Sequence, residues 1–416
     1  MALLAKDEVV FRVDLRKYPA VGELVGLRVA RQFEIHELVE LGAAGHEGSI
    51  LPQRIAIEAV PQASCTLYGL AAATQAAPIL APPAPRLAHR WIIAPGIDLA
   101  FLIGSSLAGY AYLVANVALH VPISLLWWFW SVGFDGTHIF GTASRTFFDR
   151  EARHSHRALL FGSAAFFFAL GPVMVLLGGK AVLAMIVAVW AYYHVVRQHY
   201  GFMVLYKVKN RDLAKLDNSL DRWFLGVMMV FPPFHRFFIH HPEELGLRFS
   251  FPRLEPFLWT LVAATALVYV GRQVVRIRRG DPVNLPKFLL FAGVIPLHWL
   301  TFAYMSWMGA VPTVTIVHNL QYHALIWFHN RNRYGAAPAA GSHGRIPQAV
   351  SHSLLNYVLV ALVFSALYRV PGFQLGRVSD LAFGFFCGFG LTHYYLDSRI
   401  WRVRSDPALR QALQLT

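Results

Sequence analysis

Ten apolar stretches of about 20 residues follow one another from residue 97 onward, and this is the length a helix needs to cross the hydrocarbon core of a membrane. They occupy residues 97–119, 122–146, 158–178, 181–205, 222–240, 254–274, 286–306, 309–330, 350–369 and 379–399. With 56% hydrophobic and 14% charged residues, the chain is too apolar for a soluble domain of its length. We therefore predict an all-α fold, a polytopic transmembrane bundle of about ten helices.

Basic residues gather in alternate loops between these stretches. The loops after the second, fourth, sixth, eighth and tenth stretches carry them, for example at Arg150, Lys207, Arg278, Arg331 and Arg402. The positive-inside rule then predicts a multi-pass protein of a cell membrane with both termini in the cytoplasm, and we expect a bacterial inner membrane. These loops also account for the net charge of +14, so we expect no nucleic-acid partner.

Residues 1–90 differ from the rest of the chain. A strand-like and a helix-like pattern precede an Ala/Pro-rich linker, "LAAATQAAPILAPPAPRLAHR". This segment is either a short N-terminal cytoplasmic extension or an over-long start, and the sequence leaves both interpretations open. We expect its first 85 residues to be dispensable for the site described below. The transmembrane domain is predicted to span residues 91–404, and a cytoplasmic tail follows at 405–416.

Histidines recur in the second half of the stretches that run toward the cytoplasm. His138, His199, His323 and His393 each lie six to eight residues before a basic residue that flanks the membrane. A rise of 1.5 Å per residue puts these four rings at nearly one depth, roughly 10 Å inside the boundary. His194 and His318 form a second level, thirteen residues from their basic flanks.

Two carboxylates accompany these rings. Asp135 and His138 are i, i+3 neighbours, and His393 and Asp397 are i, i+4 neighbours, so each pair shares a helix face. The pairs His194–His199 and His318–His323 are five apart, which on a regular helix separates the rings by about 140°. Either a π-bulge brings each pair together, or one ring of each pair serves another site or a hydrogen bond.

A lone histidine on an apolar helix is usually a packing residue, and we interpret His298 in this way. Six imidazoles with two carboxylates inside a membrane are too costly for packing, and they indicate a functional site. We predict a metal centre with these ligands: His138, His194, His199, His318, His323, His393, Asp135 and Asp397. Imidazole suits iron, copper and zinc, and Cys65 and Cys387 are too few for a thiolate site. These residues can hold two ions, and the resemblance to a known family given next implies that both are iron.

A nitrogen-rich dinuclear site in a helical membrane bundle resembles the integral-membrane non-haem di-iron oxygenases, such as fatty acid desaturases and hydroxylases and the bacterial β-carotene dioxygenase group. The resemblance covers residues 97–402 and implies an O2-dependent monooxygenase, desaturase or dioxygenase with a lipid-like substrate, membrane lipids around it and an electron donor protein. The HxxxH and HxxHH boxes of desaturases are absent. The nearest match, "HRFFIHH", contains His235, His240 and His241 at the non-cytoplasmic end of the fifth stretch.

Two other functions remain open from the sequence. Facing histidines on the fourth and eighth stretches are also typical of a membrane cytochrome that binds haem, an electron carrier. A metal or proton transporter ranks third, because its polar path should cross the whole bilayer, whereas these histidines stay in the cytoplasmic half.

Overall fold

The structure is a computed structural model that describes residues 86–335 and 343–415. Within these ranges the only strands are β1 (Leu87–Ala88) and β2 (Val283–Asn284), which form a short parallel pair. The remaining elements are helices, so the predicted all-α class is confirmed for the described part. Residues 1–85 lie outside it, and the predicted N-terminal extension stays a prediction.

Helices cover each of the ten apolar stretches. Seven stretches correspond to one helix each: α7 (Arg157–Leu176), α8 (Lys180–Lys209), α10 (Glu255–Arg278), α11 (Leu285–Tyr304), α12 (Trp307–Tyr334), α14 (Leu354–Val378) and α15 (Asp380–Ile400). Three stretches are composite and contain a π-helical segment. The first stretch consists of α2 (Pro95–Ile97), the π-helical η2 (Asp98–Ile103) and α3 (Ser106–Val117), and the second of α4 (Ile123–Trp130), the π-helical η3 (Ser131–Asp135) and α5 (Gly136–Arg145). The fifth consists of α9 (Lys215–Phe234) and the π-helical η4 (His235–His240).

Short helices connect or follow these elements. They are α6 (Arg150–Ser155), η5 (Pro242–Leu245), η6 (Pro252–Leu254), α13 (Arg345–His352) and α16 (Pro407–Ala412). The predicted tail is therefore partly helical. It also packs on the bundle, since Leu409 and Leu413 are buried and the Asn332 amide of α12 donates to the Ala412 carbonyl at 2.7 Å.

Six helices are long and apolar enough to cross a membrane. They are Pro95–Val117, Arg157–Leu176, Lys180–Lys209, Pro252–Arg278, Leu285–Tyr304 and Leu354–Val378. Several of them expose large apolar side chains, such as Leu176, Leu267 and Leu367, each more than 70% exposed. Three of the other four predicted stretches carry polar residues that are buried inside the bundle, for example His138 on α5, Asn319 on α12 and His393 on α15.

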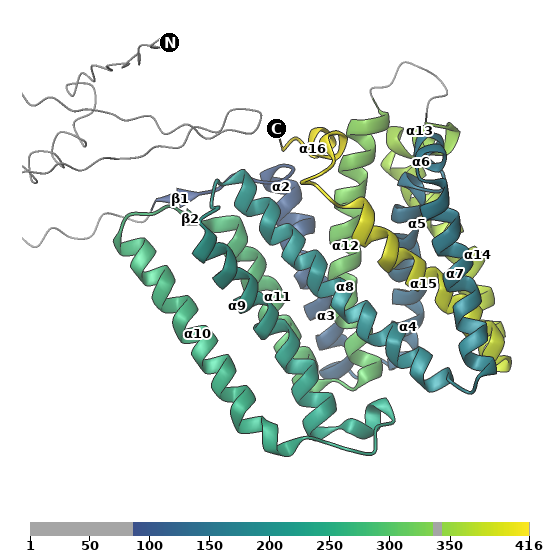
Figure 1. Cartoon of the computed structure of the whole chain (residues 1–416), viewed down its shortest axis with the longest axis horizontal. Helices are drawn as coiled ribbons and strands as arrows, with labels where there is room; N and C mark the ends of the chain where they lie inside the picture. Colours follow the sequence, from purple (N-terminus) through teal and green to yellow (C-terminus); the bar gives the residue numbers. More distant parts are fainter. Residues whose placement is uncertain (1–85, 336–342, 416) are drawn as a thin grey trace, which may run out of the picture. The chain divides into compact units, whose positions relative to one another are not determined.

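Helix α12 occupies the middle of the bundle (Figure 1). It contacts α3, α4, α5, α8 and α11, and much of its length is buried. Helix α15 lies along α7, and α14 packs against both α5 and α15. As a result, α5, α8, α12 and α15 converge at one place in the interior.

Short turns and caps set where these helices begin. The α7–α8 connection passes through Gly178, whose φ of 77° lies in the left-handed region that favours glycine. At the start of α15 the Ser379 hydroxyl accepts a hydrogen bond from the Ala382 amide at 3.3 Å, which caps the first turn. These two features fix the ends of α8 and α15, which both carry residues of the interior.

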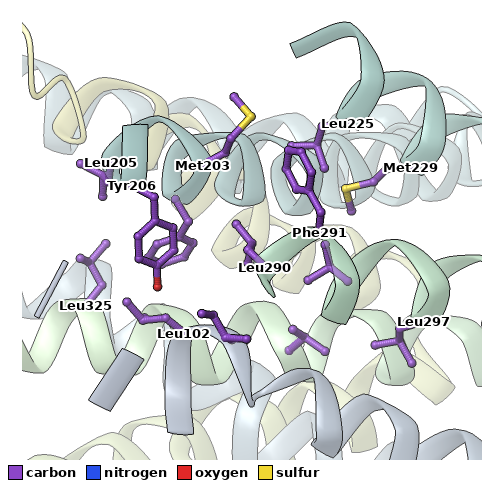
Figure 2. Packing of buried hydrophobic residues seen from close by; sticks show 14 of the residues in the cluster. Leu102, Met203, Leu205, Tyr206, Leu225, Met229, Leu290, Phe291, Leu297 and Leu325 are labelled. Atoms are coloured by element: carbon purple, nitrogen blue, oxygen red, sulfur yellow. The ribbon is translucent and has the colours of Figure 1, made fainter. Parts of the chain in front are cut away.

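The largest hydrophobic cluster lies among η2, α8, α9, α11 and α12 (Figure 2). The figure shows side chains from all five elements, including Leu102, Met203, Leu225, Leu290 and Leu325. Burying a side chain of this size contributes about 1.5–3 kcal/mol. This cluster holds α8 and α12 together beside the convergence point.

Buried charges join α8, α9 and α11 at one end. Lys207 pairs with Asp221, and the Lys287 ammonium lies 3.0 Å from Asp221 and 3.1 Å from Asp212. The Tyr269 hydroxyl donates to Asp221 at 2.7 Å. Burial by itself raises the pKa of the Asp212 carboxyl, but Lys287, Lys207 and Arg276 outweigh burial and hold that pKa at about 2.

Helices α7 and α15 touch backbone to backbone. A Cβ atom added at Gly171 would lie 1.9 Å from the carbonyl oxygen of Gly384, closer than any real contact. Small residues at such crossings let membrane helices approach closely. The position of α15, and of the side chains it carries, therefore depends on this pair of glycines.

We expect Gly171→Val to lower the melting temperature of the detergent-solubilised protein, because the added side chain must push α15 away from α7. Overpacking of this kind typically costs about 1–3 kcal/mol. The matched control is Gly162→Val on the same helix, where an added Cβ meets nothing within 4 Å. Equal melting temperatures for the two variants would contradict the close contact.

Candidate metal centre

Four histidine rings meet where α5, α8, α12 and α15 converge. They are His138 on α5, His194 on α8, His318 on α12 and His393 on α15. The ring centroids of His194 lie 4.9 Å from those of both His318 and His393. The rings of His138 and His393 are 4.5 Å apart, and their Nε2 atoms are separated by 3.0 Å. Each helix thus contributes one ring to a compact buried cluster.

The carboxylate of Asp397, one turn after His393 on α15, completes this cluster. Its Oδ1 accepts hydrogen bonds from the hydroxyls of Thr142 at 2.6 Å and Tyr322 at 2.9 Å. Its Oδ2 lies 3.8 Å from Nε2 of His194. Because the two hydroxyls fix Oδ1, the other oxygen stays oriented toward the rings.

Neighbouring groups also fix which ring nitrogens carry hydrogen. Nδ1 of His138 contacts the carbonyl oxygen of Asp135, which can only accept, so Nδ1 is the donor and Nε2 presents a lone pair. The Thr142 hydroxyl donates to Asp397 and lies 2.7 Å from Nδ1 of His393, so that nitrogen donates to Thr142. Nε2 of His393 then also presents a lone pair. Two lone pairs facing each other at 3.0 Å repel unless a cation lies beside both.

Two further ring nitrogens have no hydrogen-bond partner. They are Nε2 of His194 and Nδ1 of His318, and both are buried. Buried polar atoms are almost always paired, so such atoms call for an explanation. Nitrogen and oxygen ligands of one ion, at bond lengths of about 2.1 Å, lie roughly 3–4 Å apart. The set of donors therefore fits a metal ion without large movement.

The donors form two overlapping groups that could hold an ion. One consists of His138, His318 and His393, and the other of His194, His393 and Asp397. In each group the candidate ligand atoms lie within 4.8 Å of one another. His393 belongs to both groups, so it is the central residue of the site.

Asp135 lies beside this cluster but in neither group. Its Oδ1 is 3.7 Å from Nδ1 of His138, and its other oxygen pairs with Arg369 of α14. Asp135 is the last residue of the π-helical segment η3 and the N-cap of α5. Through its carbonyl it orients the His138 ring, which is the role of an outer partner of a ligand.

His199 and His323 lie elsewhere, although their predicted depth matches that of His138 and His393. Both nitrogens of His323 are engaged, with the hydroxyls of Thr137 at 2.9 Å and Tyr357 at 2.8 Å. His199 lies beside His298, with ring centroids 5.9 Å apart, and neither of its nitrogens has a partner. The structure therefore does not bring His138, His199, His323 and His393 together, although all four were predicted at one depth.

The direction of each ring around its helix explains this difference. Helices α8 and α12 are α-helical through both pairs of histidines, without a π-bulge. Residues five apart then point about 140° away from each other. His194 and His318 face the cluster, while His199 and His323 face other neighbours. This is the second of the two arrangements that the five-residue spacing allowed.

Sequence reasoning missed Thr142 at the site and the hydrogen bond that Tyr322 makes there. Thr142 and Tyr322 anchor Asp397, and their i, i+4 spacing from His138 and His318 was the signal available for finding them. His298, interpreted as structural, contacts both Tyr192 and His199: its Nδ1 lies 2.9 Å from the Tyr192 hydroxyl, and its Nε2 has no partner.

A cavity of about 480 Å³ adjoins the cluster. Its lining includes Asp135 and Tyr394, which contact His138 and His194 respectively. The rest of the wall is mostly apolar and aromatic, from α4, α8, α12, α14 and α15. A long apolar molecule in this space would contact Asp135 and Tyr394, which adjoin the rings. No family model, curated protein or solved structure matches the chain.

Proposed function

We propose that this chain is a membrane-embedded, iron-dependent oxidoreductase that acts with O2 on a lipid-like substrate. The observation that carries the proposal is the pair of ring nitrogens of His138 and His393, whose lone pairs are held 3.0 Å apart in a buried cluster beside an apolar cavity. Ionisable groups inside a membrane protein are costly and usually functional. The proposal accounts for both the cluster and the cavity.

Two iron ions would be held by the two groups of donors. Nε2 of His393 offers a single lone pair, so His393 would bind the first ion together with His138 and His318, and His194 and Asp397 would hold the second ion beside it. Imidazole and carboxylate ligands suit iron, and neither group contains a thiolate. Iron with such ligands, when bound, supplies O2 activation. Thr142 and Tyr322 keep Asp397 oriented, and Asp135 keeps the His138 ring in its productive tautomer.

The cavity supports a lipid-like substrate. Its aromatic and aliphatic walls exclude water, and Tyr394, whose ring centroid lies 5.0 Å from that of His194, would pack against a bound chain near the metal. Arg369, paired with Asp135, is the cationic group of the lining closest to the cluster. An electron donor protein would approach from the side of the basic loops.

The ten-span topology with both termini in the cytoplasm belongs to this proposal. Six helices have the necessary length and apolar character, and the helices in the other stretches bury their polar side chains within the bundle. A helix whose polar face is buried against its neighbours need not be uniformly apolar to lie in a membrane.

This cluster fits metal ions better than it fits a haem group. The four rings pack at centroid distances of 4.5–5.1 Å, mostly edge to face. That packing leaves no flat slot between opposing rings for a planar macrocycle. A transporter is also less well supported, because His138, His318 and His393 are buried and each is 2% exposed or less.

Filling the cavity should stop turnover without removing the metal. Ala188 of α8 lines the cavity, and Ala188→Trp should abolish lipid-dependent O2 consumption by the iron-loaded, reduced protein, because the indole occupies the space a substrate needs. An oxygen electrode with added membrane lipids measures the rate, and metal analysis measures the iron.

The matched control is Val189→Trp, since Val189 is 57% exposed and does not line the cavity. This variant should keep the wild-type rate. Wild-type protein that holds iron but shows no lipid-dependent O2 consumption would refute the proposed reaction, and an active Ala188→Trp variant would refute the cavity as its location.

A further inference from the structure

Helix α9 turns toward α10 at the lower end of both helices in Figure 1, and this turn carries a second histidine cluster, which shares no residue with the four-ring centre. His235 and His240 are the first and last residues of the π-helical segment η4, and Glu255 is the first residue of α10. The amide of His241 donates to the Arg236 carbonyl at 2.7 Å, an i, i+5 hydrogen bond that widens the turn. This widening brings two rings five residues apart onto one face.

The three side chains converge on one point. Nε2 of His235 lies 2.9 Å from Oε1 of Glu255, and Nε2 of His240 lies 3.2 Å from the same oxygen. The two Nε2 atoms are 3.2 Å apart. In a tetrahedral zinc site with bonds of about 2.0–2.1 Å, ligand atoms are separated by roughly 3.3 Å. The observed triangle matches that separation to within a few tenths of an ångström.

Hydrogen bonds alone do not satisfy this triangle. If both nitrogens donate to the Glu255 oxygen, two N–H groups of like partial charge crowd one oxygen, with their nitrogens 3.2 Å apart. If only one donates, the other ring presents its lone pair toward the carboxylate. A divalent cation in the middle removes the conflict, because both neutral rings and the carboxylate then act as donors to it.

The site is also accessible and held in place. The side chains of His235, Glu255 and His240 are 23%, 33% and 46% exposed, so an ion can enter and water can fill a fourth position. The rings of Phe231 and Trp259 flank His235, with centroids 5.1 and 5.5 Å away, and fix its orientation. Two histidines, a glutamate and an open position are a ligand set that zinc adopts in proteins.

We propose that His235, His240 and Glu255 form a second metal site, which binds Zn²⁺ and links η4, at the end of α9, to the start of α10. The site uses none of the residues of the four-ring centre and does not depend on the function proposed for that centre. Because the ion binds only the folded arrangement, Zn²⁺ raises the thermal stability of the protein.

The test is equilibrium dialysis of the full-length, chelator-treated protein in detergent against Zn²⁺. Wild-type protein should bind one more Zn²⁺ per chain than His240→Ala, and Glu255→Gln should weaken that site at least tenfold. The matched control is His241→Ala, which alters the neighbouring exposed ring that contacts Glu243 instead. It should bind as much Zn²⁺ as the wild type.

A parallel measurement in the His393→Ala background separates the two sites, since the surface site should persist when the buried centre is lost. Zn²⁺ should also raise the melting temperature of the wild type and of His393→Ala, but by less in His240→Ala. Equal Zn²⁺ binding by the wild type and His240→Ala, with both proteins folded, would overturn the proposal. Loss of the same Zn²⁺ in His241→Ala would overturn it as well.

Discussion

Replacing His393 by alanine lowers the affinity of the buried centre for iron by more than about 100-fold, because loss of a direct ligand costs more than the ~10–100-fold typical of an outer partner. His393 is the residue with the largest expected effect, since it belongs to both groups of donors. Iron content per chain, measured on purified protein after iron loading and dialysis, gives the result. The variant should still insert into membranes and elute as the wild type does.

The matched comparison is His323→Ala. His323 lies on α12 like His318, but both of its nitrogens are engaged by the hydroxyls of Thr137 and Tyr357. Its loss should reduce iron affinity far less than the loss of His393 or His318. Should His323→Ala empty the site while His318→Ala retains iron, the assignment of ligands by ring direction is wrong.

Replacing Lys287 by methionine should destabilise the protein by about 3–5 kcal/mol, because it leaves buried carboxylates without one of their cations. Lys287 and Asp221 are both fully buried, and their charged atoms lie 3.0 Å apart. The neighbouring Asp212 has a folded pKa of about 2, below its ordinary 3.8, so it is ionised at neutral pH. Its contribution to stability is present above pH 3.8 and is lost as the pH falls through about 2.

Two further variants test whether the lost stability comes from the buried charges. Lys180 pairs with Asp380 at 2.6 Å, but both side chains are at least half exposed, so Lys180→Met should change stability by less than about 1 kcal/mol. Adding Asp221→Asn to Lys287→Met should restore part of the lost stability, since it removes one of the two buried carboxylates, Asp212 and Asp221, that share Lys207 once Lys287 is gone. Melting temperatures in detergent should follow this order, and a Lys287→Met variant as stable as Lys180→Met would contradict it.

The helices were predictable because each corresponds to a run of about 20 apolar residues, and this run can be recognised without knowing which helices pack beside it. The π-helical segments within the composite helices were harder to predict. The sequence around Asp135 and around His235 gives no local signal for a π-helical segment, because the extra residue in the turn is accommodated by packing. The two π-segments nonetheless matter, since η3 ends directly before α5 and its His138, and η4 brings His235 to His240.

The candidate site was predictable in part. Distance along the sequence to a basic loop gives the depth of a side chain only coarsely, since His194 and His318, predicted at a deeper level, meet His138 and His393 in one cluster. It does not give the direction of a side chain around the helix axis. His138 and His393 share a depth and a direction, whereas His199 shares only the depth and contacts His298. That direction depends on helix crossings such as the contact of Gly171 with Gly384, which one sequence alone does not specify.

Metal analysis combined with an absorption spectrum of the purified wild-type protein tests the central claim most directly. The buried donors of His138, His194, His318, His393 and Asp397 predict two iron ions per chain and no Soret band. The ion bound by His393 should be absent from His393→Ala, and both ions should be retained in His240→Ala. Protein that stays free of iron after loading, or that shows a haem spectrum, would contradict the account.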